Sequence, residues 1–205
     1  MLSRSGFELN YQLSAMRNVR IGDLRFPFPS RWRAVRGTQR VSTSNDTGLP
    51  AHSEVRIKAE QLFDIHMTPD SSGAVTTHLT IDLGPITLRS EPDWDELGRA
   101  YPFTRGFGMV LARSMFQIPV YPWNLRETAS ALRTQPRSLQ MTLFREGYSF
   151  DAALRRCRRL NVLLEEGNVI AGLRVVSAPI DWRICVGKES SKVPRRGSCL
   201  KNVSS

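Results

Sequence analysis

The sequence has few of the residues that build disulfide frameworks. Its 205 residues include three cysteines, Cys157, Cys185 and Cys199. An odd number of cysteines does not make a disulfide framework, and no pair among them has the spacing of metal ligands. Cys157 lies in a basic helical pattern and is most simply a small packing residue. Because free thiols are typical of a reducing cytosol, we expect a cytoplasmic protein.

Long apolar runs and catalytic motifs are also missing. No uninterrupted apolar run reaches the roughly 18 residues of a membrane helix, and the first residues lack the apolar segment of a secretory signal. The sequence contains neither a phosphate-cradling glycine loop nor a nucleophile elbow. Its histidines, His52, His66 and His78, lie in no compact metal-ligand motif. We therefore expect no membrane partner, no metal or cofactor, and no enzymatic activity.

Positive charge is in excess and is unevenly distributed. The formal net charge is +10 at pH 7. Residues 1–120 carry 14 basic and 12 acidic residues, whereas residues 121–205 carry 15 basic and 7 acidic ones. A localised positive surface is typical of proteins that bind nucleic acid. A solvated helix face followed by a basic tail is the alternative explanation.

The segment 122–164 has apolar and small residues at helical spacing. Two interruptions divide it, one before Pro136 and one at Gly147, and these residue types are common at the start and just past the end of a helix. The pattern predicts a short helix, a tight turn, a second short helix and a longer basic helix, which is the outline of a helix-turn-helix. The residues expected to form its core are Leu125, Ala129, Leu132, Leu139, Leu143, Phe150 and Leu154.

The run PRSLQMTLFREGYSF, residues 136–150, resembles the first helix-turn-helix of the AraC/XylS family of bacterial transcription regulators. The family pattern is close to S-P-R-T-L-Q-R-x-L-x-x-E-G-x-S-F, followed by a linker helix with a central arginine. The matching residues here are Pro136, Arg137, Leu139, Gln140, Leu143, Glu146, Gly147, Ser149 and Phe150, with Arg158 at the place of the linker arginine. The resemblance implies a transcription regulator that binds double-stranded DNA.

Three departures from the family pattern concern the turn and the DNA-facing residues. Arg133 replaces the turn glycine, Gln135 replaces the N-cap serine, and Met141–Thr142 replace a basic pair. An arginine with positive φ costs about 1 kcal/mol relative to glycine, so either the turn adopts another geometry or the helix-turn-helix unit is degenerate. The loss of the basic pair removes potential DNA contacts.

The resemblance implies a recognition helix over residues 136–145. Arginine pairs with guanine and glutamine with adenine in the major groove, whereas contacts to phosphates fix position without reading sequence. The expected base contacts are Arg137, Ser138, Gln140 and Met141. The expected phosphate contacts are Arg145, Arg155, Arg156 and Arg159. An exposed amphipathic helix is the alternative explanation for the arginines of the linker helix, and Arg158 is the candidate for a structural ion pair.

The remaining segments complete an α+β fold, in which a small antiparallel β unit precedes the α-helical helix-turn-helix domain and a basic tail. We expect an irregular N-terminal segment (1–52) and a small β-rich unit with a following helix (53–120). The helix-turn-helix with its linker helix (121–167) and a degraded second helix-turn-helix with a flexible basic tail (168–205) come next. Alternation at Val75, Leu79 and Ile81 predicts a strand. Val175 and Val176 are alternatively strand residues.

Three functional hypotheses follow. The first is a cytoplasmic, sequence-specific transcriptional regulator that uses one helix-turn-helix. One such unit reads only a few base pairs, so it needs a homodimer, for which the apolar segment 107–116 is a candidate surface, or a second DNA contact from the tail. The second hypothesis is a regulator that docks on another regulator without specific DNA binding. An enzyme built on scattered histidines and aspartates is a third, with little support.

Overall fold

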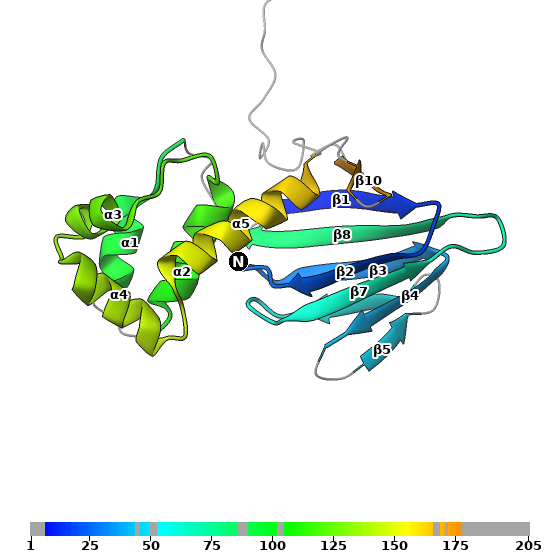
Figure 1. Ribbon diagram of the computed structural model, residues 1–205, viewed down its shortest axis with the longest axis horizontal. Coiled ribbons are helices and arrows are strands. Elements are labelled where there is room, and N and C mark those ends of the chain that lie inside the picture. Colours follow the sequence, from blue (N-terminus) through cyan, green and yellow to red (C-terminus); the bar gives the residue numbers. More distant parts are fainter. Residues whose placement is uncertain are drawn as a thin grey trace, which may run out of the picture.

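The computed structural model describes residues 7–43, 46–49, 53–85, 90–101, 105–165, 169–170 and 172–177. This part of the chain consists of antiparallel strands, here called the β unit, and a group of helices, here called the helical unit. The strands are β1 (Phe7–Ala15), β2 (Val19–Leu24), β3 (Ser30–Arg36), β4 (Thr38–Ser42), β5 (Asp46–Leu49), β6 (Glu54–Ile57), β7 (Phe63–Thr68), β8 (Val75–Gly84), β9 (Val169–Ile170) and β10 (Leu173–Ser177). The helices are α1 (Trp94–Ala100), α2 (Phe107–Gln117), α3 (Leu125–Ala131), α4 (Pro136–Arg145) and α5 (Phe150–Leu164). Figure 1 shows the helices gathered at one end and the strands at the other.

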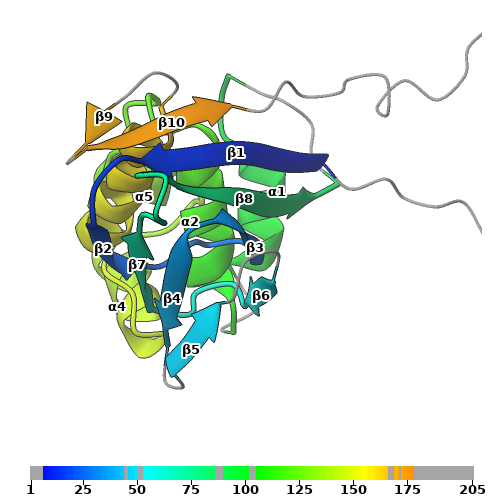
Figure 2. The ribbon, with the colours of Figure 1, turned by 90° about the vertical axis from the view of Figure 1, so that its right-hand side faces the viewer.

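The strands form two antiparallel sheets that face each other. One sheet has the order β6-β3-β8-β1-β10-β9, and the other has the order β2-β7-β4-β5. Figure 2 looks from the strand end, with the helices behind. Inside, Trp32 donates its indole N–H to Gln39 Oε1 at 2.9 Å, which satisfies two buried polar groups between the sheets.

Alternation along the strands explains why they fill this core. In β8, every second residue from Val75 to Leu83 is buried, as the sequence predicts. In β7 the buried residues are Phe63, Ile65 and Met67. Successive side chains of a strand point to opposite faces, so each strand offers one apolar row to the partner sheet.

The expectation of an irregular segment over residues 1–52 is wrong, because β1 to β5 lie within it. Pro27 and Pro29 lie in the connection between β2 and β3, where proline is tolerated, and not inside a strand. Phe26, Phe28 and Trp32 are buried in the core and are therefore not available to stack on nucleic acid.

The expectation of a second helix-turn-helix after residue 168 is also wrong for the described residues there. β10 pairs antiparallel with β1, from Ala15 opposite Leu173 to Tyr11 opposite Ser177. Val175 and Val176 are strand residues, which was the alternative interpretation. The basic tail from Lys188 lies outside the described residues. Since β8 and β10 both flank β1, the helical unit is an insertion between two strands of one sheet.

Helix α2 is the centre of the helical unit. It packs against α1, α4 and α5, and its apolar side chains Phe107, Leu111 and Met115 are almost fully buried. The segment 107–116 is therefore mainly core rather than an exposed dimer surface, and a domain boundary at residue 120 would separate α2 from its partners. No helix among the described residues is long and apolar enough to cross a membrane.

Substitution of Leu173 tests the place of β10 in the sheet. Leu173 is 1% exposed, so Leu173→Ala should lower the free energy of unfolding by about 2–5 kcal/mol through lost burial and a cavity. The neighbouring Arg174 is exposed, so Arg174→Ala should change it by less than about 0.5 kcal/mol. Urea denaturation of both variants measures the difference; equal effects would remove β10 from the core.

Candidate nucleic-acid interface

Helix α3 has well-defined caps at both ends. Asn124 Oδ1 accepts hydrogen bonds from the backbone N–H groups of Arg126 at 2.8 Å and Glu127 at 3.4 Å. At the other end, Arg133 N donates to Ser130 O and Thr134 N donates to Ala129 O, both at 2.9 Å. This is the Schellman arrangement, which places one residue in the left-handed conformation.

That left-handed residue is Arg133, with φ of 53°. The turn therefore keeps the conformation in which the family pattern has glycine, and the arginine bears its steric cost. The two helices of the helix-turn-helix consequently keep their connection despite the substitution.

Helix α4 starts and ends as its sequence predicts. Gln135 is extended and makes no side-chain capping bond, and Pro136 follows at the start of the helix. At the end, Gly147 has φ of 74°, and Tyr148 N donates to Leu143 O at 2.9 Å. Gly147 thus ends α4 and directs the chain into α5.

The residues predicted to form the helix-turn-helix core all face inward. Leu125 is half-buried, and the other six are buried: Ala129, Leu132, Leu139, Leu143, Phe150 and Leu154. Sequence reasoning missed further members of this core, namely Trp123, Thr128, Ala153 and Leu160. The helical spacing of Ala153 and Leu160 with Leu154 and Cys157 was the signal that could have identified them.

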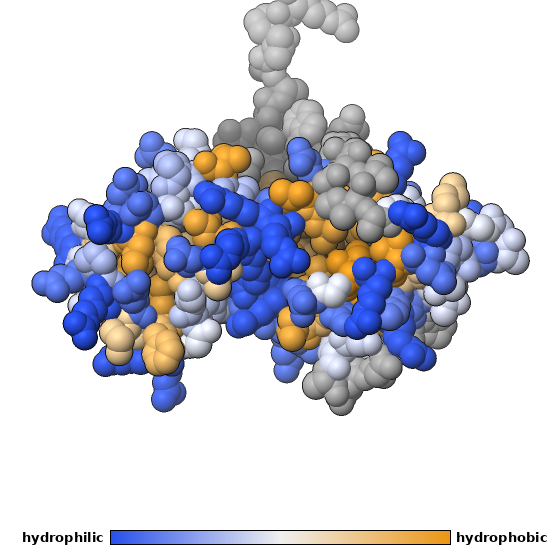
Figure 3. Space-filling view, in the orientation of Figure 1, coloured by the Kyte–Doolittle hydropathy of each residue, from blue (hydrophilic) through white to orange (hydrophobic). Residues whose placement is uncertain are grey.

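The four predicted base-contact residues lie on the solvent side of α4. Arg137, Ser138, Gln140 and Met141 are all exposed. Among the predicted phosphate contacts, Arg145, Arg155 and Arg159 are also exposed. The helical unit lies at the end of the molecule away from the sheets, where hydrophilic side chains dominate the visible face (Figures 1 and 3). The exposed side of α4 is thus open to a large ligand.

Arg156 has a different role from the predicted phosphate contact. Its two terminal nitrogens donate to the two carboxylate oxygens of Glu60, each at 2.9 Å. Glu60 also forms an ion pair with Arg25 Nε at 2.7 Å. The Arg156 side chain is therefore held by a carboxylate and is 18% exposed. It fixes α5 against the β unit and is unavailable to DNA.

Arg158 also acts within the protein. Its Nε donates to Pro119 O at 3.2 Å, and its Nη2 lies 3.5 Å from Tyr121 O. The arginine at the linker position therefore holds the segment before α3, through backbone carbonyls rather than an ion pair.

Glu146 caps the N-terminus of α2. Its carboxylate accepts three backbone N–H bonds, from Gly106 at 3.0 Å, Phe107 at 3.2 Å and Gly108 at 2.7 Å. A carboxylate suits a helix N-terminus because it satisfies unpaired donors and complements the helix dipole. The sequence pattern contained Glu146 but gave no indication of this long-range cap.

Tyr148 packs between the two units. A Cβ atom on Gly108 would collide with its ring, so glycine is required for this approach. Burial, together with the negative charge of Glu60, raises the pKa of Tyr148 to about 12. Nearby on α5, burial raises the pKa of the Cys157 thiol to about 11, and Cys157 Sγ donates to Ala112 O at 3.3 Å. Both groups are therefore neutral packing elements at pH 7.

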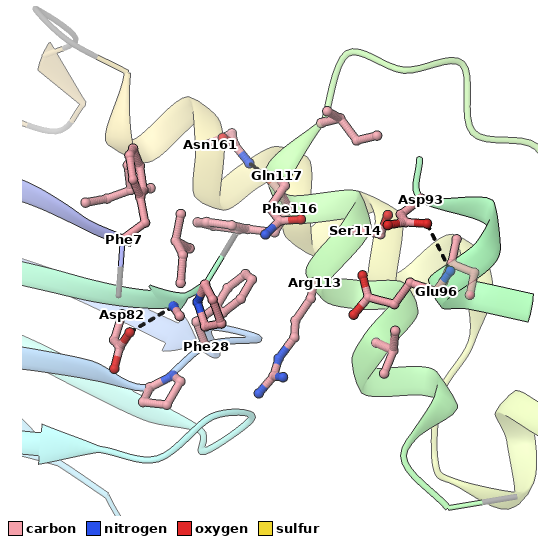
Figure 4. Close-up of a pocket in the computed structure, with 18 of the residues that line it drawn as sticks. Phe7, Phe28, Asp82, Asp93, Glu96, Arg113, Ser114, Phe116, Gln117 and Asn161 are labelled. Carbon is pink, nitrogen blue, oxygen red and sulfur yellow. Dashed lines mark hydrogen bonds between the residues drawn. The ribbon is translucent and has the colours of Figure 1, made fainter. Parts of the chain in front are cut away.

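A cavity of about 600 Å³ lies between the six-stranded sheet and helices α1 and α2 (Figure 4). Phe28 and Phe116 line it on the apolar side. Arg113 donates to Pro27 O at 3.1 Å and stacks over Phe28. The carboxylates that line the cavity are Asp82, Glu91, Asp93 and Glu96. Among the described residues that line the cavity, these four carboxylates outnumber the one arginine, so this lining is unfavourable for a phosphate group. Within the described residues, no group of three His, Cys, Asp or Glu side chains is arranged to hold a metal.

Replacement of Arg133 tests the strained turn. Arg133→Gly should raise the free energy of unfolding by about 1 kcal/mol, because glycine adopts positive φ without the clash of a Cβ. Arg155, which is exposed in the middle of α5, is the control. Arg155→Gly should lower the free energy of unfolding by about 1 kcal/mol. Thermal and urea denaturation measure both. A loss of stability in Arg133→Gly would contradict the left-handed assignment.

Replacement of Glu146 tests the cap of α2. Glu146→Gln should lower the free energy of unfolding by about 1.5–3 kcal/mol, because an amide offers one acceptor oxygen and turns an NH₂ group toward backbone donors. Glu127, exposed on α3, supplies the control, and Glu127→Gln should change it by less than about 0.5 kcal/mol. Amide hydrogen exchange of Phe107 and Gly108 should rise only in the first variant; unchanged exchange there would argue against the cap.

Comparison with known proteins places the chain in no family. No family model matches it, and no curated protein matches it by sequence. Among solved structures it is similar to a cupin superfamily protein from Desulfitobacterium hafniense, with a TM-score of 0.33, 10% identity, and coverage of 40% of this chain and 72% of that one. It is also similar to an HTH_3 family transcriptional regulator from Vibrio cholerae, with a TM-score of 0.31, 6% identity, and coverage of 40% and 47%. Likenesses this weak establish neither a shared fold nor a shared function.

Proposed function

We propose that this chain is a sequence-specific, double-stranded DNA-binding transcriptional regulator of the AraC/XylS kind, acting in the bacterial cytoplasm without catalysis. One observation carries the proposal. Leu139 and Leu143 of helix α4 are 0% and 1% exposed. Its other sides carry the exposed residues Arg137, Gln140 and Met141. A helix held in this way after a tight turn presents its polar side to the major groove.

Each exposed side chain has a distinct task in this proposal. Arg137 lies in the first turn of α4, the part of a recognition helix that reaches base edges, and its guanidinium fits the acceptor pair of guanine. Gln140, one turn later, fits adenine. Ser138 and Met141 complete the set of base contacts.

Phosphate contacts would position this helix. Arg145 is at the end of α4, and Arg155 and Arg159 lie one turn apart on α5, so the latter two share a face. With Arg156 and Arg158 engaged inside the protein, we propose these three as the phosphate contacts. Affinity should then fall with salt, with a slope of about −0.9 in log K against log salt for each phosphate contacted.

A second candidate function rests on the exposed apolar residues of α4. Met141 stands where the family pattern has a basic residue, and it is 46% exposed. A regulator that docks on a protein partner through this surface is the alternative. In either case a single helix-turn-helix contacts a short site, so a homodimer or a second regulator would supply the remaining affinity.

The test is selection of DNA from a random duplex pool, followed by fluorescence anisotropy at two salt concentrations. The proposal predicts enrichment of a short motif. Arg137→Ala combined with Gln140→Ala should weaken binding to that motif by roughly 5- to 150-fold for each lost base contact.

The matched control is Arg33→Ala combined with Gln12→Ala. Both residues are exposed on the sheets, and the pair removes the same charge and the same side-chain types. This control should reduce affinity only slightly. Binding without an enriched motif, equal in both double variants and steep in salt, would mean that the basic surface attracts DNA without reading it, and would reject the proposal.

A further inference from the structure

Two large apolar side chains are exposed on the helix that carries the proposed base contacts. Phe144 is 74% exposed and Met141 is 46% exposed. By contrast, Phe107, Phe116 and Phe150, in the other helices of this unit, are between 1% and 5% exposed. An apolar patch is visible over the α4 end of the molecule in Figure 3.

Helix geometry keeps this patch directed outward. Met141 and Phe144 are three residues apart, so their side chains are neighbours on one face. Leu139 and Leu143 occupy the opposite face and are 0% and 1% exposed. Because that face fills the helix-turn-helix core, α4 cannot rotate to bury Phe144 without exposing two leucines.

Positive charge lies on both sides of the patch. Arg137 precedes Met141 by four residues and Arg145 follows it by four, so the three form one row along α4. Both arginines are exposed. A ligand that fits this surface of α4 therefore combines negative charge with small apolar groups at close spacing.

We infer that Met141 and Phe144 contact the 5-methyl groups of thymines in the major groove, an inference that rests on the proposed function. The thymine methyl is the apolar group that base pairs display there, and phosphates on either side supply the negative charge. Gln140 adds to this choice, because an adenine–thymine pair presents both an edge for glutamine and a methyl group. The DNA class read by this helix is thus rich in thymine within its contact site.

The size of the patch favours DNA over a protein partner. One buried aromatic side chain contributes about 150–250 Å², so Phe144 and Met141 together supply a few hundred square ångströms at most. A stable protein interface buries about 1,200–2,000 Å². A patch of two side chains is small for such an interface but sufficient for one or two methyl groups.

The test replaces thymine by deoxyuridine in the selected DNA site, one position at a time. This change removes the methyl group and leaves the hydrogen-bonding edge intact. Wild-type protein should bind the uracil-containing site roughly fourfold more weakly for each methyl contacted, as expected when one methyl group leaves an apolar contact. Fluorescence anisotropy at fixed salt measures the ratio.

Protein variants assign the methyl contact to residues. Phe144→Ala and Met141→Ala should bind thymine and uracil sites with a ratio nearer to one, since the apolar partner is gone. Val162→Ala is the matched control, because Val162 is an apolar residue of α5 that is 52% exposed; it should keep the wild-type ratio. Arg137→Ala should weaken binding to both sites equally. Circular dichroism confirms that each variant is folded.

The outcomes separate this inference from the proposed function. A selected motif that wild-type protein binds equally well with thymine or uracil would overturn the methyl contact while leaving specific DNA binding intact. A uracil effect that persists in both Phe144→Ala and Met141→Ala would also overturn it. Failure to select any motif would reject the proposed function and this inference together.

Discussion

The carboxylate of Glu60 links the helical unit to the β unit by binding one arginine from each. It lies in the turn between β6 and β7 and binds Arg25 of the β unit and Arg156 of α5. Glu60 is 13% exposed, and its φ of 62° lies in the left-handed region, which costs a non-glycine residue about 1–2 kcal/mol. An ion pair this deep adds little net stability, but loss of one partner leaves a poorly solvated charge, so the interaction favours a single orientation of α5.

The carboxylate of Glu146 makes a second set of contacts, within the helical unit. Tyr148 lies between Glu60 and Glu146, with its ring against Gly108 and within about 6 Å of the Arg25 and Arg156 guanidiniums. Two residues earlier, Glu146 holds the start of α2. The sequence E-G-Y-S-F is therefore a set of structural roles: Glu146 caps one helix, Gly147 ends another, Tyr148 packs between units and Phe150 enters the core.

The sequence predicted best what depends on nearby residues. Helices α3 to α5 follow from 3.6-residue spacing, the two ends of α4 follow from Pro136 and Gly147, and β8 follows from alternation. What it could not predict depends on distant partners. Arg156 binds a residue 96 positions earlier, so nothing local distinguished it from Arg155. Two prolines obscured the early strands, and β10 became a strand because β1 was available to pair with it. Local signals defined the proposed DNA-reading helix, whereas long-range contacts selected which arginines remain exposed.

The insertion of the helical unit between β8 and β10 has a consequence for synthesis. Strand β1 leaves the ribosome before β8 and β10, and it can pair with β8 once that strand has emerged. The other edge of β1 can pair only with β10, which is synthesised after the whole helical unit. Local helical contacts form faster than distant strand pairs, so the helix-turn-helix can be complete while this edge still lacks its partner. An unpaired strand edge is prone to join other chains. The order of synthesis therefore makes the unpaired edge of β1, rather than the helices, the vulnerable part of the nascent chain.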